Sequence, residues 1–330
     1  MIEAYRSQIK ELQTDLENHI QNLTFGEDPK ELYEPIAYLM SLGGKRIRPL
    51  LTLMAYGLYK KDYKTILSPA LAVEIFHNFT LMHDDIMDDA PLRRGEATVH
   101  EKWNPNTAIL SGDVMMVRAY DMLLEVPSEK LTLCMKHFNR TAAEVCEGQQ
   151  FDMIFENRKQ VSEKEYLEMI RLKTAVLLGF SLQYGAMLAG APADDVQRLY
   201  DFGVNIGIGF QLKDDVLDVY ADKAKFGKQV GGDIISNKKT YLLIKAMELA
   251  KGREADELVY WGSAKEFDKA EKVLAVTSIY DSLGIKDLAE AKIEAYFEKG
   301  FEQLRHIKPV YQEALQGLTF LAQDLISREN

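Results

Sequence analysis

Apolar positions spaced three and four residues apart recur along most of the chain, with polar residues between them. This period is that of an amphipathic α-helix. No row of alternating apolar and polar residues joined by Asn-Gly turns, the pattern of paired strands, is present. The helical pattern is clearest in residues 31–42, 49–60, 73–82, 164–180, 199–212, 241–252 and 289–304. The chain is therefore predicted to be all-α.

Short turns separate these segments, and no long linker rich in proline or serine interrupts them. The sequence contains no repeat of fixed period and no low-complexity tract. With 330 residues, of which 47% are apolar, the chain is long enough to bury a sizeable core. We therefore expect one domain that covers residues 1–330.

One segment has the length of a membrane span, because residues 174–193 carry no charge. The segment also contains Gln183, Tyr184, Pro192 and three glycines, and no basic cluster flanks it. A helix buried inside a large bundle explains this composition better than a helix in lipid. We expect no transmembrane segment.

The chain carries 51 acidic and 40 basic residues, a net charge of −11, which argues against a nucleic acid or an anionic membrane as its main partner. Cys134 and Cys146 are the two cysteines, and their spacing fits no disulfide framework or metal site. Both are predicted to be small core residues. The chain start lacks the apolar block of a signal peptide. These features predict a cytoplasmic protein.

The acidic residues are concentrated in the segment "HDDIMDDAPLRRG", residues 83–95. Ser68 and Pro69 are predicted to be the N-cap and first position of a helix that runs toward these acids. Asp84 and Asp88 would then lie on one face, about 5–6 Å apart, at the negative end of the helix dipole. This arrangement is unfavourable unless a cation compensates for it.

A second cluster, "DDVLD" at residues 214–218, repeats the DDxxD spacing at the end of another apolar helix. Mg²⁺ prefers oxygen ligands and is commonly shared between carboxylates, water and substrate phosphates. Basic turns accompany the acids: "GGKRIRP" at 43–49, "LRRG" at 92–95 and "FGKQVGGD" at 226–233. Together the clusters predict a site where metal ions and basic side chains bind a highly anionic, phosphorylated ligand.

Other catalytic motifs are absent or incomplete. Glu74 and His77 form an ExxH pair, but a di-iron bundle needs a second such pair and the sequence has none. The sequence also lacks a Walker A loop, a GxGxxG fingerprint and a GxSxG elbow.

The motifs resemble those of the polyprenyl synthetase family, the trans-isoprenyl diphosphate synthases. The resemblance covers residues 43–243 and includes, in the family's order, "GGKRIRP", "HNFTLMHDDIMDDAPLRRG", "GQQFD", "KT", "GFQLKDDVLD", "GKQVGGD" and "NKKT". It implies a homodimeric all-α bundle of the isoprenoid synthase type, with a central apolar cavity. It also implies a prenyltransferase that joins isopentenyl diphosphate to an allylic diphosphate (dimethylallyl, geranyl or farnesyl), with three Mg²⁺ ions per site.

The resemblance also implies roles for individual residues. The magnesium-binding acids would be Asp84, Asp85, Asp88, Asp214, Asp215 and Asp218. The isopentenyl diphosphate site would contain Lys45, Arg48, His77 and Arg94. The groups around the allylic diphosphate and the reacting carbons would be Arg93, Lys173, Thr174, Gln211, Lys228 and Lys238. Asn237 stands where many members have glycine, and this weakens the match around Lys238.

Three residues on the helix of the first motif are candidates for setting product length. Phe79 lies about 7.5 Å along the axis from Asp84, Phe76 is one turn deeper, and Thr80 is nearly beneath Asp84. Ordinary core packing is the alternative role for both phenylalanines. An aromatic at Phe79, a small residue at Thr80 and no insertion in the motif resemble geranylgeranyl (C20) synthases more than farnesyl (C15) ones.

Several alternatives remain open at this point. The product could be farnesyl diphosphate or a chain longer than C20. The chain could be a non-catalytic subunit of a heteromeric synthase, although such subunits usually lack one DDxxD motif. A class I terpene cyclase would share the metal chemistry, but it would not need Lys45, Arg48 and His77 for a second diphosphate.

Overall fold

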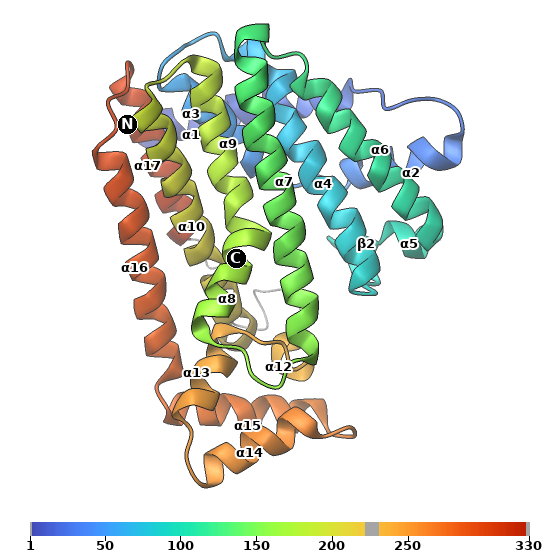
Figure 1. Ribbon diagram of the computed structural model, residues 1–330, viewed down its shortest axis with the longest axis vertical. Helices are drawn as coiled ribbons and strands as arrows, with labels where there is room; N and C mark the ends of the chain where they lie inside the picture. Colours follow the sequence, from blue (N-terminus) through green and yellow to red (C-terminus); the bar gives the residue numbers. More distant parts are fainter. Residues whose placement is uncertain (1, 222–230, 328–330) are drawn as a thin grey trace. The chain divides into compact units, whose positions relative to one another are not determined.

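The computed structural model describes residues 2–221 and 231–327, and nearly all of its regular secondary structure is helical (Figure 1). All seven segments predicted to be helical coincide with helices, with ends that differ by a few residues. The helices before residue 160 are α1 (Ile2–Gln21), α2 (Lys30–Ser41), α3 (Ile47–Gly57), the 3-10 turn η1 (Tyr63–Ile66), α4 (Leu67–Met87), α5 (Val99–Lys102), α6 (Pro105–Leu123) and α7 (Ser128–Asn157). Those that follow are α8 (Glu163–Ile170), the π-helical turn η2 (Arg171–Ala175), α9 (Val176–Ala189), α10 (Ala193–Tyr220), α12 (Gly232–Ile235), α13 (Tyr241–Leu249), α14 (Arg253–Ser263), α15 (Lys269–Ser282), α16 (Ile285–Arg305) and α17 (Gln312–Ser327). The all-α prediction is confirmed.

Within the described residues, the β-sheet consists of one short hairpin of two strands. Strands β1 (Leu92–Arg93) and β2 (Glu96–Ala97) are antiparallel, with Leu92 opposite Ala97 and Arg93 opposite Glu96. Arg94 and Gly95 form the two-residue turn, and both have positive φ angles, 55° and 85°. Positive φ at both central residues is the requirement of a type I′ turn, whose twist matches paired strands. Arg93 is thus the last residue of β1, and Arg94 is the first residue of the turn.

The chain divides into two compact units. The first contains residues Met1–Arg140, Phe180–Tyr200 and His306–Leu321, and the second contains Thr141–Gly179, Asp201–Arg305 and Ala322–Asn330. Each unit is assembled from segments that are distant in sequence, so tertiary packing and not chain order defines it. The single domain over residues 1–330 remains a prediction.

In the first unit, α4 is a core helix that packs against α3 and α6 (Figure 1). Its N-terminal half, from Pro69 to Phe76, is buried on all sides. A helix that is apolar all round needs such surroundings, because no face of it is suited to water. The burial holds α4 firmly and so positions the acids at its C-terminal end.

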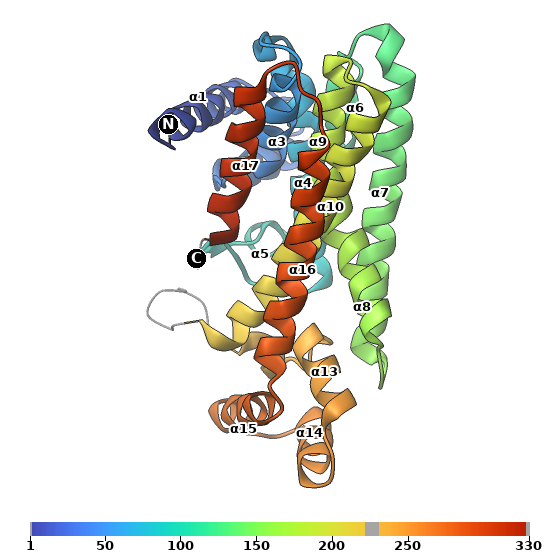
Figure 2. The same cartoon turned by 90° about the vertical axis from the view of Figure 1, so that its left-hand side faces the viewer.

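In the second unit, α13 packs against α8, α15 and α16, and α14 packs against α15. Figure 2 shows α14 and α15 close together at the end of this unit. The acidic segment of α10 belongs to the same unit. The second DDxxD motif and the loop that precedes α13 are therefore parts of one packed body.

Two segments are long and apolar enough to cross a membrane, residues 63–87 and 163–189. Within their most apolar windows, 61% and 83% of residues are buried inside the protein. Core helices of soluble proteins pass the same test of length and composition. Residues 174–189 thus lie in a packed helix, which is the alternative that the sequence favoured.

Two local predictions are wrong. Helix α4 begins at Leu67, with Ile66 as an N-cap that makes no side-chain hydrogen bond, and Ser68 is not the cap. The 3-10 turn η1 runs directly into α4, and Pro69 is tolerated within the first turn because N–H groups there have no intrahelical partner. Cys134 is buried as predicted, but Cys146, also on α7, is exposed.

Candidate active site

The first acidic motif lies at the C-terminal end of α4, where Asp88 is the C-cap residue and donates its N–H to the Asp84 carbonyl over 2.9 Å. Asp84 is half-buried and Asp88 is exposed, whereas Asp85 is only 3% exposed. Arg93 of β1 donates to both oxygens of Asp85, Nε to Oδ2 over 2.7 Å and Nη2 to Oδ1 over 2.5 Å. Asp85 therefore holds the hairpin against α4, and the outer two acids are the ones open to solvent.

The basic turn between α2 and α3 touches the hairpin. Arg94 Nη1 donates to the Gly43 carbonyl oxygen. Gly44 has φ of 137°, and a Cβ at this position would lie 2.9 Å from Arg94 Nη2. Glycine is required here both for its backbone conformation and for the close approach of the guanidinium. The predicted neighbours "GGKRIRP" and "LRRG" are thus brought together.

Four arginines of this unit act electrostatically on His77, in the middle of α4. Burial, followed by the charges of Arg48, Arg94, Arg93 and Arg46, lowers the pKa of His77 well below its usual value. The imidazole is therefore neutral at pH 7. Such a group of cations favours an anion, since a bound anion would offset their mutual repulsion.

Arg46 and Arg48 have different roles in this cluster. Arg46 is buried and fully engaged, with Nη1 donating to Glu74 over 3.0 Å and Nη2 to the Met40 carbonyl over 2.6 Å. Burial lowers the pKa of Arg48 to about 10, and the nearby Glu74 opposes this shift. Arg48 Nε is buried without a hydrogen-bond partner among the described residues. A buried donor without a partner fits a ligand oxygen. Lys45, at the edge of the same turn, is exposed.

The three chain-length candidates lie on α4 as expected. Phe76 is fully buried, with its ring 5.7 Å from that of Phe79 and 5.2 Å from that of Phe138. Phe79 is half-buried and packs edge-on against His83, with 4.7 Å between ring centroids. Thr80 is half-buried, and its hydroxyl donates to the His77 carbonyl over 2.7 Å. Phe76 is therefore part of an aromatic core, and Phe79 is the more accessible ring.

In the second unit, the second motif repeats the pattern of the first. Asp214 is exposed and Asp218 is half-buried, whereas Asp215 is only 3% exposed. The Tyr166 hydroxyl and the Tyr241 N–H both donate to Asp215. Burial raises the pKa of Asp215 to about 7, against the lowering effect of these bonds. As in the first motif, the middle aspartate is buried and held while the outer two are accessible.

Lys173 lies in the π-helical turn η2, and its Nζ donates to Asp152 over 2.6 Å. The turn packs closely on α7, because a Cβ at Gly148 would lie 2.2 Å from the Lys173 backbone nitrogen. The segment "GQQFD" therefore supplies both the close approach and the acid that positions Lys173. Thr174, the next residue, donates to Gln211 over 3.3 Å, so these two predicted residues are also brought together.

The loop that carries Lys238 is held by a buried lysine. Asn237 has φ of 56° and accepts a hydrogen bond of 2.7 Å from Lys272, which is 1% exposed. Lys238 is 3.9 Å from Asp233, whose backbone N–H donates to Asp218 over 3.0 Å. Asn237, where the sequence departs from the family pattern, is therefore held in place by the hydrogen bond from the buried Lys272. Lys228, predicted to bind the allylic diphosphate, lies outside the described residues.

The donor set in each unit fits magnesium. Accessible carboxylates, without imidazole or thiol among the predicted ligands, form a set of hard oxygen donors. Burial raises the pKa of Asp233, and the charges of Asp218, Asp152 and Asp214 raise it further. The carboxylates of the second unit therefore repel one another, which is the condition that a divalent cation relieves.

Several residues of these clusters were missed at the sequence level. Tyr166 donates to Asp215, Asp152 accepts from Lys173, and the Asp233 N–H donates to Asp218. The segments "GQQFD" and "GKQVGGD" contained signals for Asp152 and Asp233, but no pattern marked Tyr166.

Comparisons with known proteins agree with this geometry. The sequence model of the family described as "Polyprenyl synthetase" matches residues 29–280. A geranylgeranyl diphosphate synthase of Methanosarcina mazei is 37% identical over 332 aligned positions, covering 100% of this chain and 99% of the relative. A geranylfarnesyl diphosphate synthase of Natronomonas pharaonis is 35% identical, covering 92% of this chain and 91% of the relative.

The fold agrees as well. The crystal structure of a geranylgeranyl pyrophosphate synthetase from Pyrococcus horikoshii superposes with a TM-score of 0.91 at 33% identity, covering 99% of both chains. A decaprenyl diphosphate synthase of Rhodobacter capsulatus gives a TM-score of 0.85 at 27% identity over the full length of both chains. With the family model, the full-length relatives and the two acidic motifs in agreement, the chain belongs to the polyprenyl synthetase family.

Proposed function

We propose that this protein is a trans-prenyltransferase that joins isopentenyl diphosphate to an allylic diphosphate and releases pyrophosphate. The observation that carries the proposal is the cation cluster around His77 on the helix that ends in the first DDxxD motif. One diphosphate held by acids and metal ions would leave this cluster without a role. A second diphosphate gives it one, and this favours an elongating synthase over a terpene cyclase.

The presence of both motifs supports catalysis by this chain over the role of a non-catalytic subunit. We assign the accessible acids Asp84, Asp88, Asp214 and Asp218 as magnesium ligands. Asp85 would position the hairpin, because Arg93 engages both of its oxygens. Asp215 would hold α10 against α13, because it accepts hydrogen bonds from Tyr166 and Tyr241. This division refines the set of six acids that the resemblance implied.

Each basic residue has a role in holding charge. Arg48, Arg94 and neutral His77 would donate to isopentenyl diphosphate, with Lys45 at the rim. Arg93, Lys173, Lys228 and Lys238 would stabilise the allylic diphosphate. Mg²⁺, when bound, would neutralise the charge that gathers on the departing pyrophosphate. Thr174 and Gln211 would orient the reacting carbons, and preorganised charge of this kind lowers the barrier because it needs no rearrangement during the reaction.

The proposed product is geranylgeranyl diphosphate (C20). The half-buried ring of Phe79 lies on α4 one to two turns from the acids, and the fully buried Phe76 lies deeper. A chain that grows along α4 would meet Phe79 first. Relatives named geranylgeranyl diphosphate synthase support the same length, and one named geranylfarnesyl diphosphate synthase marks a longer product as the alternative.

The protein is further proposed to act as a cytoplasmic homodimer. On and just after α6, Leu110, Val117 and Leu124 are 58%, 58% and 57% exposed. They are seven residues apart, so they lie on one face of the helix. Exposed apolar side chains that share one helical face are typical of an interface, and a second copy of this chain is the proposed partner.

The test is incubation of the purified protein with dimethylallyl and isopentenyl diphosphates and Mg²⁺, followed by chromatography of the prenyl product. We expect mainly C20 product with some C15, and no turnover in excess EDTA. Asp84→Ala and Asp214→Ala should each lower kcat by orders of magnitude, because a lost ligand misplaces the charge that stabilises the leaving group. Full activity in EDTA would contradict the proposal.

A further inference from the structure

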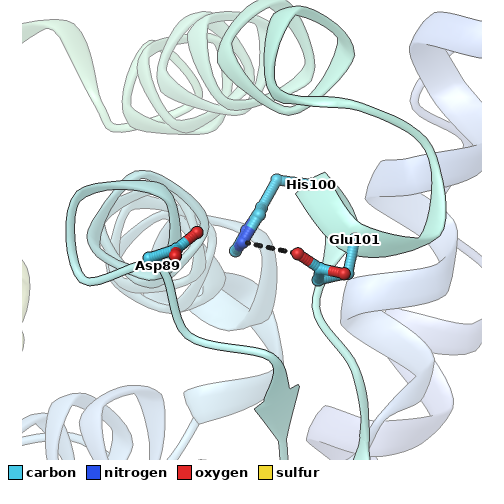
Figure 3. Close-up of side chains that lie close together, drawn as sticks. All are labelled: Asp89, His100 and Glu101. Atoms are coloured by element: carbon cyan, nitrogen blue, oxygen red, sulfur yellow. Dashed lines mark ion pairs between the residues drawn. The ribbon is translucent and has the colours of Figure 1, made fainter.

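A group of three side chains that the proposed mechanism does not use lies beside the first acidic motif. Each of Asp89, His100 and Glu101 offers one ligand atom, and the three atoms lie within 4.8 Å of one another. Figure 3 shows the His100 ring between the two carboxylates, with its nitrogen directed toward Glu101. Asp89 follows the C-cap of α4, and the other two residues belong to the short helix α5.

The backbone holds these residues together. Asp89 has φ of 49°, which turns the chain away from α4. On the far side of the hairpin, the buried Thr98 donates its hydroxyl to the Ala90 carbonyl over 2.7 Å and its N–H to the Pro91 carbonyl over 3.1 Å. Thr98 is also the N-cap residue of α5. The two ends of the hairpin are thus joined, and Asp89 is brought to the start of α5.

His100 is the unusual member of the group. It is only 7% exposed, and both ring nitrogens are buried without a hydrogen-bond partner among the described residues. A buried polar group without a partner is destabilising, because it has lost its hydration without gaining a hydrogen bond. Asp89 and Glu101 are exposed, and neither forms an ion pair with a lysine or arginine in the described part of the chain. The group therefore combines an unpartnered nitrogen with two negative charges.

The separation of the ligand atoms suits an ion shared between them. His100 Nε2 is 3.7 Å from Glu101 Oε1, which is too long for a hydrogen bond. Two ligands bound to one zinc ion at about 2.1 Å, at a roughly tetrahedral angle, lie about 3.4 Å apart. A small side-chain movement would bring the Asp89 carboxylate to the same distance from the ion.

We propose that Asp89, His100 and Glu101 bind one divalent transition-metal ion of the zinc type. An imidazole with two carboxylates is a mixed N/O set that Zn²⁺ accepts, whereas Mg²⁺ prefers oxygen ligands alone. The ion would tie the end of α4 to α5 and so brace the hairpin that carries Arg93 and Arg94. The site is separate from the magnesium chemistry, and it stands or falls independently of the proposed prenyl transfer.

The test measures zinc binding to the full-length, metal-stripped protein in excess Mg²⁺, which occupies the oxygen-only acid clusters. Equilibrium dialysis against Zn²⁺ with elemental analysis should give about one zinc ion per chain. Asp89→Asn and Glu101→Gln remove one ligand each at exposed positions where folding is not at risk. Each should weaken zinc binding at least about tenfold, since even outer-shell changes cost 10–100-fold. Zinc should raise the Tm of the wild type more than that of either variant.

Asp113→Asn is the matched control. Asp113 pairs with His83 over 3.9 Å without a third ligand, so this variant should bind zinc as the wild type does. Co²⁺ in place of zinc should give the visible absorption of a coordinated ion in the wild type and the control, and lose it in both site variants. Absence of zinc binding by the wild type overturns the proposal. Equal zinc binding by the wild type, Asp89→Asn and Glu101→Gln overturns it as well, because the ion would then sit elsewhere.

Discussion

At the scale of single residues, the environment of each titratable group matters more than its identity. His77 and Asp215 both lie beside predicted binding residues. The pKa of His77 is lowered, and the pKa of Asp215 is raised. Burial and neighbouring guanidinium groups keep His77 neutral, and burial favours the protonated form of Asp215. In both cases burial favours the uncharged form of the group.

His77 makes stability depend on pH in a defined direction. Below about pH 6.5 the unfolded chain takes up a proton that the folded chain does not, so the free energy of unfolding should fall as pH falls from 7.5 to 5.5. Replacement by glutamine removes this group. Urea unfolding across this range should show that the wild type loses about 1 kcal/mol more than His77→Gln. His19→Gln, on α1, is the control and should follow the wild type. Identical pH profiles for His77→Gln and the wild type would contradict the assignment.

At the scale of elements, α4 carries much of the site of the first unit. Its C-terminal end bears the outer acids, its middle bears His77, and its buried side bears Phe76 and Phe79. A helix fixes the spacing of these groups at 1.5 Å per residue, so the distance from acids to aromatic rings is built into one rigid element. We therefore expect product length to depend on how far along α4 from the acids a large side chain first blocks the growing chain.

Substitutions on α4 should change product length. Phe79→Ala opens the space beside the growing chain and should shift the product toward chains longer than C20. Thr80→Phe places a ring nearer the acids and should shift it toward C15. Chromatography of products from the purified variants measures both effects. Tyr260→Ala, at an aromatic residue of α14 that is 59% exposed, is the control and should keep the wild-type distribution. If both α4 variants also keep it, these side chains do not limit the chain.

At the scale of the whole molecule, the surface of α6 and the residue after it suggests how copies of the chain assemble. Leu110, Val117 and Leu124 expose more than half of each side chain along one helical face. In the second unit, Leu274 on α15 is 73% exposed. A single exposed leucine is ordinary on a protein surface, whereas a row of them favours association.

The double variant Leu110→Glu/Val117→Glu should therefore be monomeric. Two carboxylates placed in an apolar interface would lose hydration without gaining partners, at a cost of several kcal/mol. Light scattering coupled to size-exclusion chromatography measures the mass directly. Leu274→Glu is the control and should have the mass of the dimer that we propose for the wild type. A dimeric double variant would show that this face of α6 is not the interface.

The sequence alone determined the helical class, the positions of seven helical segments and the two DDxxD motifs at helix ends, because these depend on periodicity and on spacing within one element. Through the resemblance to a known family, it also grouped Arg94 with the basic turn that carries Lys45 and Arg48, and Thr174 with Gln211. It could not determine which motif acids are accessible. Asp84 and Asp85 are equivalent in the sequence pattern, and only the packed structure shows that Arg93 engages both oxygens of Asp85.

The tertiary structure likewise decided the contacts between residues that are distant in sequence or separated by a turn. Tyr166 meets Asp215, and Lys272 holds Asn237, through packing that no local pattern encodes. Asp89 reaches His100 only because the hairpin and Thr98 bring the ends of a loop together. The physical reason is the same in each case. Helix formation depends on neighbours within a few residues along the chain, whereas burial and the choice of polar partner depend on which surfaces meet when the elements pack.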